Sequence, residues 1–267
     1  RGEPVTYLHL HAAGLLALAS EHALRFKETE VASLQRAFGE TLKSQAFVQT
    51  PESVNIESGL WGLSDWEDAE PLPDQVERSI VNYLLHHPGS PFRDLEVDLN
   101  GKFPGLLTPS LGLIRHILAS YAIQADERWT LRPEDEPAAR RVDIENVIQH
   151  LHTLAARFGY SSILEQGSGN VLRWADKGRT VFNFHIIASA VVGKILRAAV
   201  AAPRQCAIVL PGGRVGLLAH KLDRDPGLGI LAREWRLIKF RHLQHLAGLA
   251  ALTPDRFIKE LSGDMAE

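Results

Sequence analysis

The sequence predicts an α+β protein of several domains: an N-terminal helical arm, a three-helix segment ending in a β-hairpin, and a mixed α/β domain. Apolar residues recur at helical spacing throughout the first half of the chain. Prolines and glycines divide that half into short segments. After residue 160, strand-like runs alternate with helical ones. The 267 residues suffice for two or three small domains.

Residues 1–60 are expected to form the helical arm and its linker. Apolar positions recur there at four-residue spacing until Pro51, which cannot continue a helix. The acidic stretch Glu57–Pro73 follows and contains Trp61 and Trp66. We expect this stretch to dock through its two aromatic residues.

Residues 61–135 have the pattern of a winged helix-turn-helix. Three short helices are expected, separated at His87–Ser90 and at Pro104–Gly105. Thr108, followed by a proline, is the expected N-cap of the third helix. A polar turn and a strand at Trp129–Leu131 complete the predicted wing.

The third helix of such a domain often reads DNA. Its predicted outward face offers Arg115 and His116, and only the arginine is permanently charged. A structural or protein-binding role for this helix therefore stays open beside a DNA-reading role.

Charge is divided unevenly along the chain, although the net charge is only −3. Residues 61–135 carry 6 Lys/Arg against 13 Asp/Glu, a net charge of −7. Residues 171–259 carry 15 Lys/Arg against 5 Asp/Glu, a net charge of +10. A basic half predicts a polyanionic partner, and we expect DNA. The alternative is an ordinary solvated surface.

The single cysteine and the hydropathy of the chain indicate where in the cell the protein is expected. Cys206 is the single cysteine, which excludes an internal disulfide and fits a reducing, cytoplasmic location. The longest apolar stretches are too short to cross a bilayer, so no membrane partner is expected. Because the chain begins at Arg1-Gly2 without Met, we expect it to be a segment of a longer protein.

Residues 140–260 are predicted to form the α/β domain, after a charged hinge at Pro133–Arg141. The strand-like segments are "NVLRW" (170–174), "VFNFHIIAS" (181–189) and "CAIVLPGGRVGLLAHKL" (206–222), the last of which runs into a helix. This order resembles the restriction-endonuclease-like fold of the PD-(D/E)xK superfamily over residues 143–249.

The resemblance implies a carboxylate centre for Mg²⁺, but the matching positions are not acidic. Asn170, Asn183 and His185 stand where that family has its carboxylates. Neutral Asn is a weak ligand, and His prefers softer metals. We therefore expect no catalytic residues and no metal. The alternative is an active nuclease that uses Glu165 and Asp176, the nearby acids.

The whole chain also resembles the C-terminal region of bacterial adenine-type DNA methylases of modification and defence loci. The stretch "GEPVTYLHLHAAGLLAL" (2–18) carries this likeness. No "NPPY" or "DPPY" motif and no glycine-rich cofactor loop is present, so we expect no S-adenosylmethionine and no other cofactor. The implied partner is an attached or associated methylase or restriction subunit.

A glycine turn in the basic half suggests a phosphate site. Gly212 and Gly213 follow a predicted strand and begin a helix, where backbone amides can hold an anion. Arg214, Lys221 and Arg224 would add positive charge. The alternative is a tight turn with a helix cap. Together these patterns predict a non-catalytic, DNA-associated accessory region, with a protein-interaction scaffold as the remaining alternative.

Overall fold

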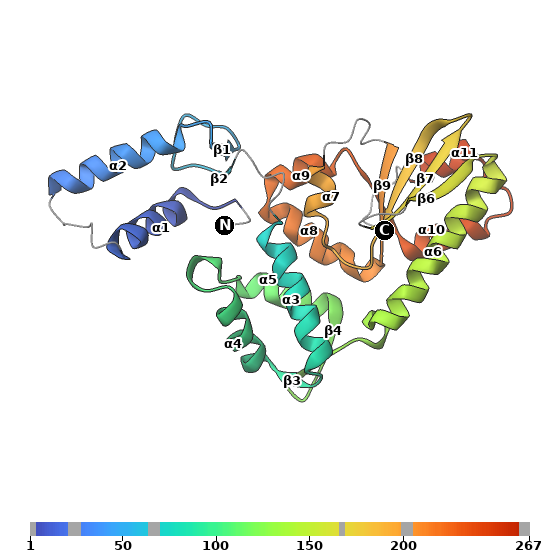
Figure 1. Ribbon diagram of the computed structural model, residues 1–267, viewed down its shortest axis with the longest axis horizontal. Coiled ribbons are helices and arrows are strands. Elements are labelled where there is room, and N and C mark those ends of the chain that lie inside the picture. Colours follow the sequence, from blue (N-terminus) through green and yellow to red (C-terminus); the bar gives the residue numbers. More distant parts are fainter. Residues whose placement is uncertain (1–3, 21–27, 64–69, 166–168, 199–204, 262–267) are drawn as a thin grey trace.

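The computed structural model describes residues 4–20, 28–63, 70–165, 169–198 and 205–261, and within them it confirms the α+β class (Figure 1). The helices are α1 (Tyr7–Ser20), α2 (Glu28–Leu42), α3 (Leu72–His86), α4 (Phe92–Lys102), α5 (Leu111–Tyr121), α6 (Pro137–Phe158), α7 (Gly193–Arg197), α8 (Val215–Arg224), α9 (Pro226–Ala232), α10 (Phe240–Gly248) and α11 (Pro254–Glu260). The strands are β1 (Phe47–Thr50), β2 (Leu60–Leu63), β3 (Ser90–Pro91), β4 (Ala122–Ala125), β5 (Arg128–Leu131), β6 (Ser161–Glu165), β7 (Asn170–Asp176), β8 (Arg179–Ile186), β9 (Cys206–Leu210) and β10 (Arg236–Lys239).

The arm, residues 4–63, consists of α1, α2 and the antiparallel pair β1–β2, and it projects from one side of the molecule (Figure 1). Trp61 on β2 is buried, and its indole N–H donates to the carbonyl of Ile56 at 2.8 Å. The Trp61 backbone also pairs with Val5. One of the two predicted docking aromatics is therefore buried, while Trp66 lies outside the described residues. No residue of α1 is buried.

The first lobe, residues 70–132, contains α3, α4 and α5 and a small sheet in the order β3-β5-β4. The three expected helices and the terminal hairpin are present. The N-cap of α5 was predicted at the wrong residue. Ser110 caps it, because its hydroxyl accepts from the backbone N–H of Leu113 at 3.2 Å, whereas Thr108 donates to the carbonyl of Phe103.

The second lobe, residues 137–261, is built on a five-stranded sheet in the order β10-β9-β8-β7-β6. Strands β6, β7 and β8 form an antiparallel meander, and β9 and β10 continue it in parallel with β8. Helix α6 precedes the meander and ends at Phe158, and its C-cap Gly159 has the positive φ of 76° that glycine adopts readily.

Helices cover both faces of this sheet. Alternate strand residues such as Trp174, Phe184 and Val209 pack with α6, α10 and α11 on one face. The alternating set Cys206, Ile208 and Leu210 packs with α8 and α9 on the other. Between β8 and the described start of β9, the only described helix is the short α7, and no signal in the sequence identified α9 and α11.

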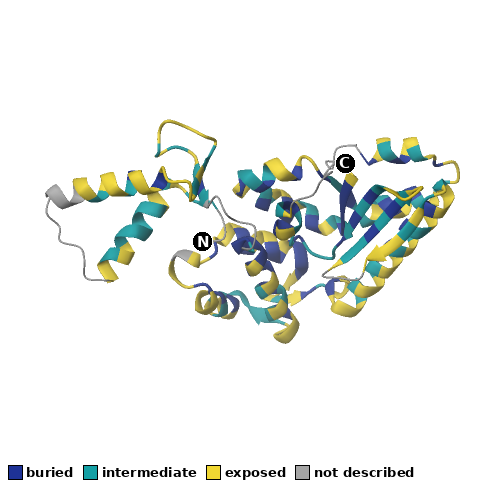
Figure 2. Cartoon of the chain, turned by 45° about the horizontal axis from the view of Figure 1, so that its top comes forward, coloured by how far each residue is buried: buried dark blue, intermediate teal, exposed yellow. Residues whose placement is uncertain are grey.

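The hydrophobic core of the first lobe continues into the second. One buried cluster contains residues of α3, α4 and α5 together with residues of α7, α8, α9 and β9. Figure 2 shows buried residues gathered where the lobes meet, while the arm consists mainly of exposed and intermediate residues.

The predicted hinge at Pro133–Arg141 is not a free linker. It contains a short 3-10 helix, Pro133–Asp135, and the start of α6. Since the side chain of Asp135 is only 1 % exposed, the hinge is anchored in the interior. This anchor and the shared core argue against two separable folding units at the hinge. Among the described residues, no helix combines the length and the apolar character that crossing a membrane requires.

Candidate functional site

The nuclease-like positions do not form one cluster. Asn170 begins β7 opposite Ile186, on the strand face that carries Leu172 and is buried against α6. Asn183 and His185 alternate on the other face of β8. The three residues expected at a carboxylate centre are therefore divided between two faces of the sheet, which corrects the idea of one degenerate site.

Asn183 and His185 have structural surroundings. The Asn183 side chain hydrogen-bonds to buried Cys206 on the neighbouring strand β9, and burial raises the pKa of this thiol. The ring of His185 lies edge-on to Trp235, with ring centroids 5.1 Å apart. Burial lowers the pKa of His185, while nearby Glu165 opposes the shift. This face thus holds a neutral imidazole beside an amide and a protonated thiol.

The two fallback acids are far apart. Glu165 ends β6 opposite Val171 and forms an exposed ion pair with Arg173 at 3.6 Å. Asp176 ends β7, five residues further along the strand, or roughly 17 Å at about 3.3 Å per residue. Two carboxylates at that separation cannot share one Mg²⁺, whose ligands lie at about 2.1 Å. Within the described ranges, no group of three or more His, Cys, Asp or Glu could hold a metal ion.

Arg214 does not face solvent, which corrects its predicted role as an open phosphate ligand. Its side chain is 1 % exposed and pairs with Asp135. The guanidinium also donates to the backbone carbonyl of Ser120 and lies 3.4 Å from the centroid of the Tyr121 ring. Burial lowers the pKa of Arg214. Its positive charge is therefore balanced by Asp135 inside the protein.

Lys221 is buried in the same way, and its predicted role as an open phosphate ligand is corrected for the same reason. Its ammonium, on a side chain 3 % exposed, pairs with Asp74 at 2.6 Å and with Glu77, and donates to the carbonyl of Ala190 at 3.0 Å. Burial raises the pKa of Asp74, and Lys221 opposes that shift. Both acids lie on α3, so this cation joins the second lobe to the first.

The remaining members of the predicted phosphate site are on the surface. Arg224 is exposed at the end of α8, and Gly213 is exposed. Gly212 is half-buried in the turn between β9 and α8. Arg224 does not join Gly212 and Gly213 in a common cavity, whereas Arg214 does.

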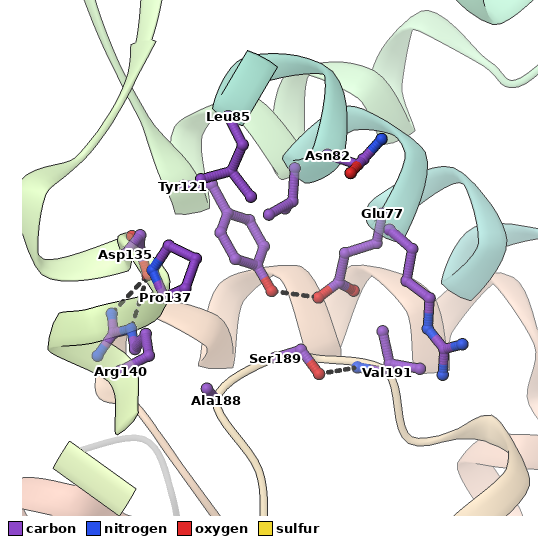
Figure 3. A pocket seen from close by; sticks show the side chains of 12 residues that line it. Glu77, Asn82, Leu85, Tyr121, Asp135, Pro137, Arg140, Ala188, Ser189 and Val191 are labelled. Atoms are coloured by element: carbon purple, nitrogen blue, oxygen red, sulfur yellow. Dashed lines mark hydrogen bonds and ion pairs between the residues drawn. The ribbon is translucent and has the colours of Figure 1, made fainter. Parts of the chain in front are cut away.

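We call the buried set that joins the lobes the junction network. It consists of Asp74, Glu77, Tyr121, Asp135, Arg214 and Lys221. Figure 3 shows Tyr121 directed at Glu77, to which its hydroxyl donates, and Asp135 bound by Arg140. Burial raises the pKa of Tyr121 well above its usual 10.0, so the phenol keeps its proton. Acids of the first half therefore neutralise cations of the second inside the protein.

A cavity of about 300 Å³ lies beside the junction network (Figure 3). Its lining is mostly apolar, with Val81, Leu85 and Pro137 among the lining residues. Glu77 and the Oδ1 atom of Asp135 are bound to protein partners, whereas the Oδ2 atom of Asp135 is buried without a hydrogen-bond partner among the described residues. The cavity has room for a small apolar group but offers it few free hydrogen-bonding atoms.

The predicted outward face of α5 is partly covered by the second lobe. The ring of His116 stacks on His220 of α8, with ring centroids 3.9 Å apart. Ser120, on the last turn of α5, donates to the carbonyl of Gly213 at 2.7 Å. Arg115 remains exposed. His116 is exposed as well, so Arg115 and His116 share a solvent-facing surface as predicted, although one face of the His116 ring is covered by His220.

Sequence reasoning missed the junction acids Asp74, Glu77 and Asp135 and their partner Tyr121. The signal that could have found them is the opposite charge of the two halves, which also suits contact between those halves. Comparison with protein families, with curated proteins and with solved structures finds no match for this chain.

Proposed function

We propose that this chain is a non-catalytic, nucleic-acid-associated accessory region that binds phosphates through the exposed cations of its second lobe. In this proposal the first lobe is a winged helix with a structural role, and the second is a restriction-endonuclease-like domain without a carboxylate centre. The region would serve an attached or associated DNA-modifying or restriction subunit.

The element order supports both fold assignments. In the first lobe, a strand between the first two helices pairs with the terminal hairpin in the order β3-β5-β4, which is the arrangement of a winged helix. In the second lobe, a helix, an antiparallel meander, a crossover and a parallel strand follow each other as in the nuclease-like fold. The contacts of α5 with α8 favour a structural use of the winged helix.

The observation that carries the non-catalytic proposal is the neutral sheet face. Asn183 and His185 occupy the centre of that face, and Glu165 is held by Arg173. Because no two carboxylates of the described residues lie near each other there, Mg²⁺ would lack the ligands that hold it in place to activate water and to stabilise negative charge. The active-nuclease alternative loses its support because Glu165 and Asp176 lie at opposite ends of the meander.

Positive charge remains on the surface after the junction network is taken into account. Without Arg214 and Lys221, residues 171–259 still contain 13 Lys/Arg against 5 Asp/Glu. Lys177, Arg179 and Arg224 are among the exposed cations. Contacts of such side chains with phosphates are independent of base sequence and are weakened by salt.

The test is a fluorescence-anisotropy titration of duplex DNA at several salt concentrations. We expect binding at low salt, with a log–log slope of about −0.9 for each phosphate neutralised. The variant Lys177→Gln/Arg179→Gln should flatten that slope by up to about two units if both residues contact phosphates. Arg93→Gln/Lys102→Gln in the first lobe is the matched control. Absence of binding at low salt would refute the proposal.

Incubation with Mg²⁺ or Mn²⁺ tests the non-catalytic part. We expect no cleavage of plasmid, linear or single-stranded DNA. Cleavage that disappears in Glu165→Gln or Asp176→Asn would restore the nuclease alternative.

A protein-interaction scaffold is the second candidate, and the arm favours it. Helix α1 contains no Asp, Glu, Lys or Arg, and none of its residues is buried. Leu8 and Leu16 are 74 % and 61 % exposed. Helices α1 and α2 are short and bury little of their surface, so they are only marginally stable alone. A protein partner with an apolar groove would cover the exposed apolar side chains of α1. Loss of a co-purifying subunit in Leu8→Ser/Leu16→Ser, with DNA binding unchanged, would support this role.

A further inference from the structure

A second cavity lies where two parallel strands of the second lobe end. It has a volume of about 350 Å³. Strand β9 leads into it through the turn Gly212–Gly213, and β10 leads into it through Phe240 and Arg241 at the start of α10. In parallel α/β sheets, ligands bind at the carboxyl ends of the strands. We call this cavity the arginine pocket, after Arg132, Arg140, Arg214 and Arg241 in its lining.

Two of these four guanidinium groups have no carboxylate partner within the described part of the chain. Arg132 donates to the backbone carbonyls of Ala122 and Ala119. Arg241 is exposed and makes no hydrogen bond or ion pair with any described residue.

The other two guanidinium groups balance most of the acids in the lining. Arg140 and Arg214 share Asp135, and Arg140 also binds Asp143 at 2.7 Å. Glu134 is the third acid of the lining and is exposed. Four arginines against three acids leave the pocket with a net positive charge.

The backbone adds positive potential at the same place. Helix α10 begins there, and the side chain of its N-cap residue, Lys239, does not bind the N–H groups of the first turn, which carry the positive end of the helix dipole. Arg241 lies over the glycine turn, because a Cβ added to Gly212 would be 3.7 Å from the Arg241 Nε atom. A side chain at residue 212 would therefore extend toward the position of this guanidinium.

We propose that the arginine pocket binds a phosphate monoester, and in particular the 5′-phosphate at the end of a nucleic-acid strand. This inference rests on the proposed function and makes its phosphate binding specific. A monoester carries about −1.5 to −2 charges at pH 7, more than a phosphodiester, and it offers three acceptor oxygens to guanidinium donors. A cavity of this volume suits a terminal nucleotide.

The test compares 5′-phosphorylated and 5′-hydroxyl oligonucleotides of one sequence by anisotropy, using the full chain. Adenosine 5′-monophosphate is titrated separately by calorimetry. We expect the 5′-phosphorylated strand to bind roughly tenfold more tightly. Arg241→Gln should remove most of that preference, and it should leave the fold intact because the side chain is exposed and unpaired. Arg233→Gln, another exposed arginine of the same lobe, is the matched control and should keep the preference.

The outcomes separate this inference from the proposed function. If duplex DNA binds with a salt-dependent slope but the 5′-phosphate has no effect and the mononucleotide does not bind, the pocket is refuted and the proposed function stands. If the mononucleotide binds in an Arg241-dependent way while DNA does not, the pocket stands for a free nucleotide and the proposed function is refuted. Equal loss of the preference in Arg233→Gln and Arg241→Gln would refute the pocket as its source.

Discussion

Replacing Lys221 by Met should be among the most destabilising single changes in this protein. The ammonium is the cation shared by Asp74 and Glu77, and all three side chains are 3 % exposed or less. Methionine fills a similar volume but leaves two carboxylates buried side by side. Removing one partner of a buried ion pair costs roughly 3–5 kcal/mol, and we expect a loss of free energy of unfolding in this range. At about 2–4 °C per kcal/mol, the melting temperature should fall by roughly 6–20 °C.

The size of this effect should depend on pH in a defined direction. Burial raises the pKa of Asp74 above 3.8, so the folded state binds more protons than the unfolded state in the range just above that value. The contribution of Asp74 to stability therefore falls as the pH rises through this window. Loss of Lys221 removes the group that opposes the shift, so the window moves to higher pH. The variant should consequently be closer to the parent at pH 5 than at pH 8.

Urea denaturation at both pH values measures the effect. Arg224→Met, in the same helix but exposed, is the control and should change stability by no more than about 0.5 kcal/mol. The combined variant Lys221→Met/Asp74→Asn/Glu77→Gln should recover part of the loss, because it removes the unpaired charges and keeps acceptors for the backbone N–H groups of Gly193 and Ala190. A Lys221→Met protein within 1 kcal/mol of the parent at both pH values would refute the reasoning.

Three further predictions test other parts of the fold. Gly193→Ala should lower the free energy of unfolding in urea by about 1–3 kcal/mol, because its Cβ would lie 2.2 Å from the Cγ of Pro71. Gly216→Ala, in open space on α8, should raise it by up to about 1 kcal/mol. Equal effects of the two substitutions would contradict this account. Residues 70–261 should melt in one calorimetric transition with slow trypsin cleavage at 133–141, and two transitions would contradict the shared core. Lys177→Asn should raise the melting temperature slightly, because φ is 48° there in a two-residue hairpin turn, and a lower melting temperature would count against this account.

Local signals in the sequence predicted much of the secondary structure. The left-handed glycine after α6 and the breaks between α3, α4 and α5 were readable from residue types alone. The N-cap of α5 was misplaced because Thr108 and Ser110 both have capping side chains, and the choice between them depends on backbone geometry.

The candidate sites were harder to predict because they depend on contacts between distant segments. Arg214 lies 79 residues from Asp135, and Lys221 lies 147 residues from Asp74. No local pattern distinguishes a cation that will be buried from one that stays in solvent. The charge asymmetry was seen, but it was interpreted as a signal for an external partner when part of it is satisfied within the chain. The division of Asn170 from Asn183 follows from strand register, which residue types alone did not specify.

The core shared by the two lobes has a consequence for how the protein is made. During synthesis the first lobe leaves the ribosome with its apolar helix faces and the carboxylates of Asp74 and Glu77 awaiting residues that are encoded much later. Roughly a hundred residues separate the end of β5 from Trp235, one of the last members of that core. At about 5–20 residues per second, translation of that interval takes roughly 5–20 s. The nascent chain is therefore exposed to aggregation for that period, and chaperone binding during translation should be strongest there.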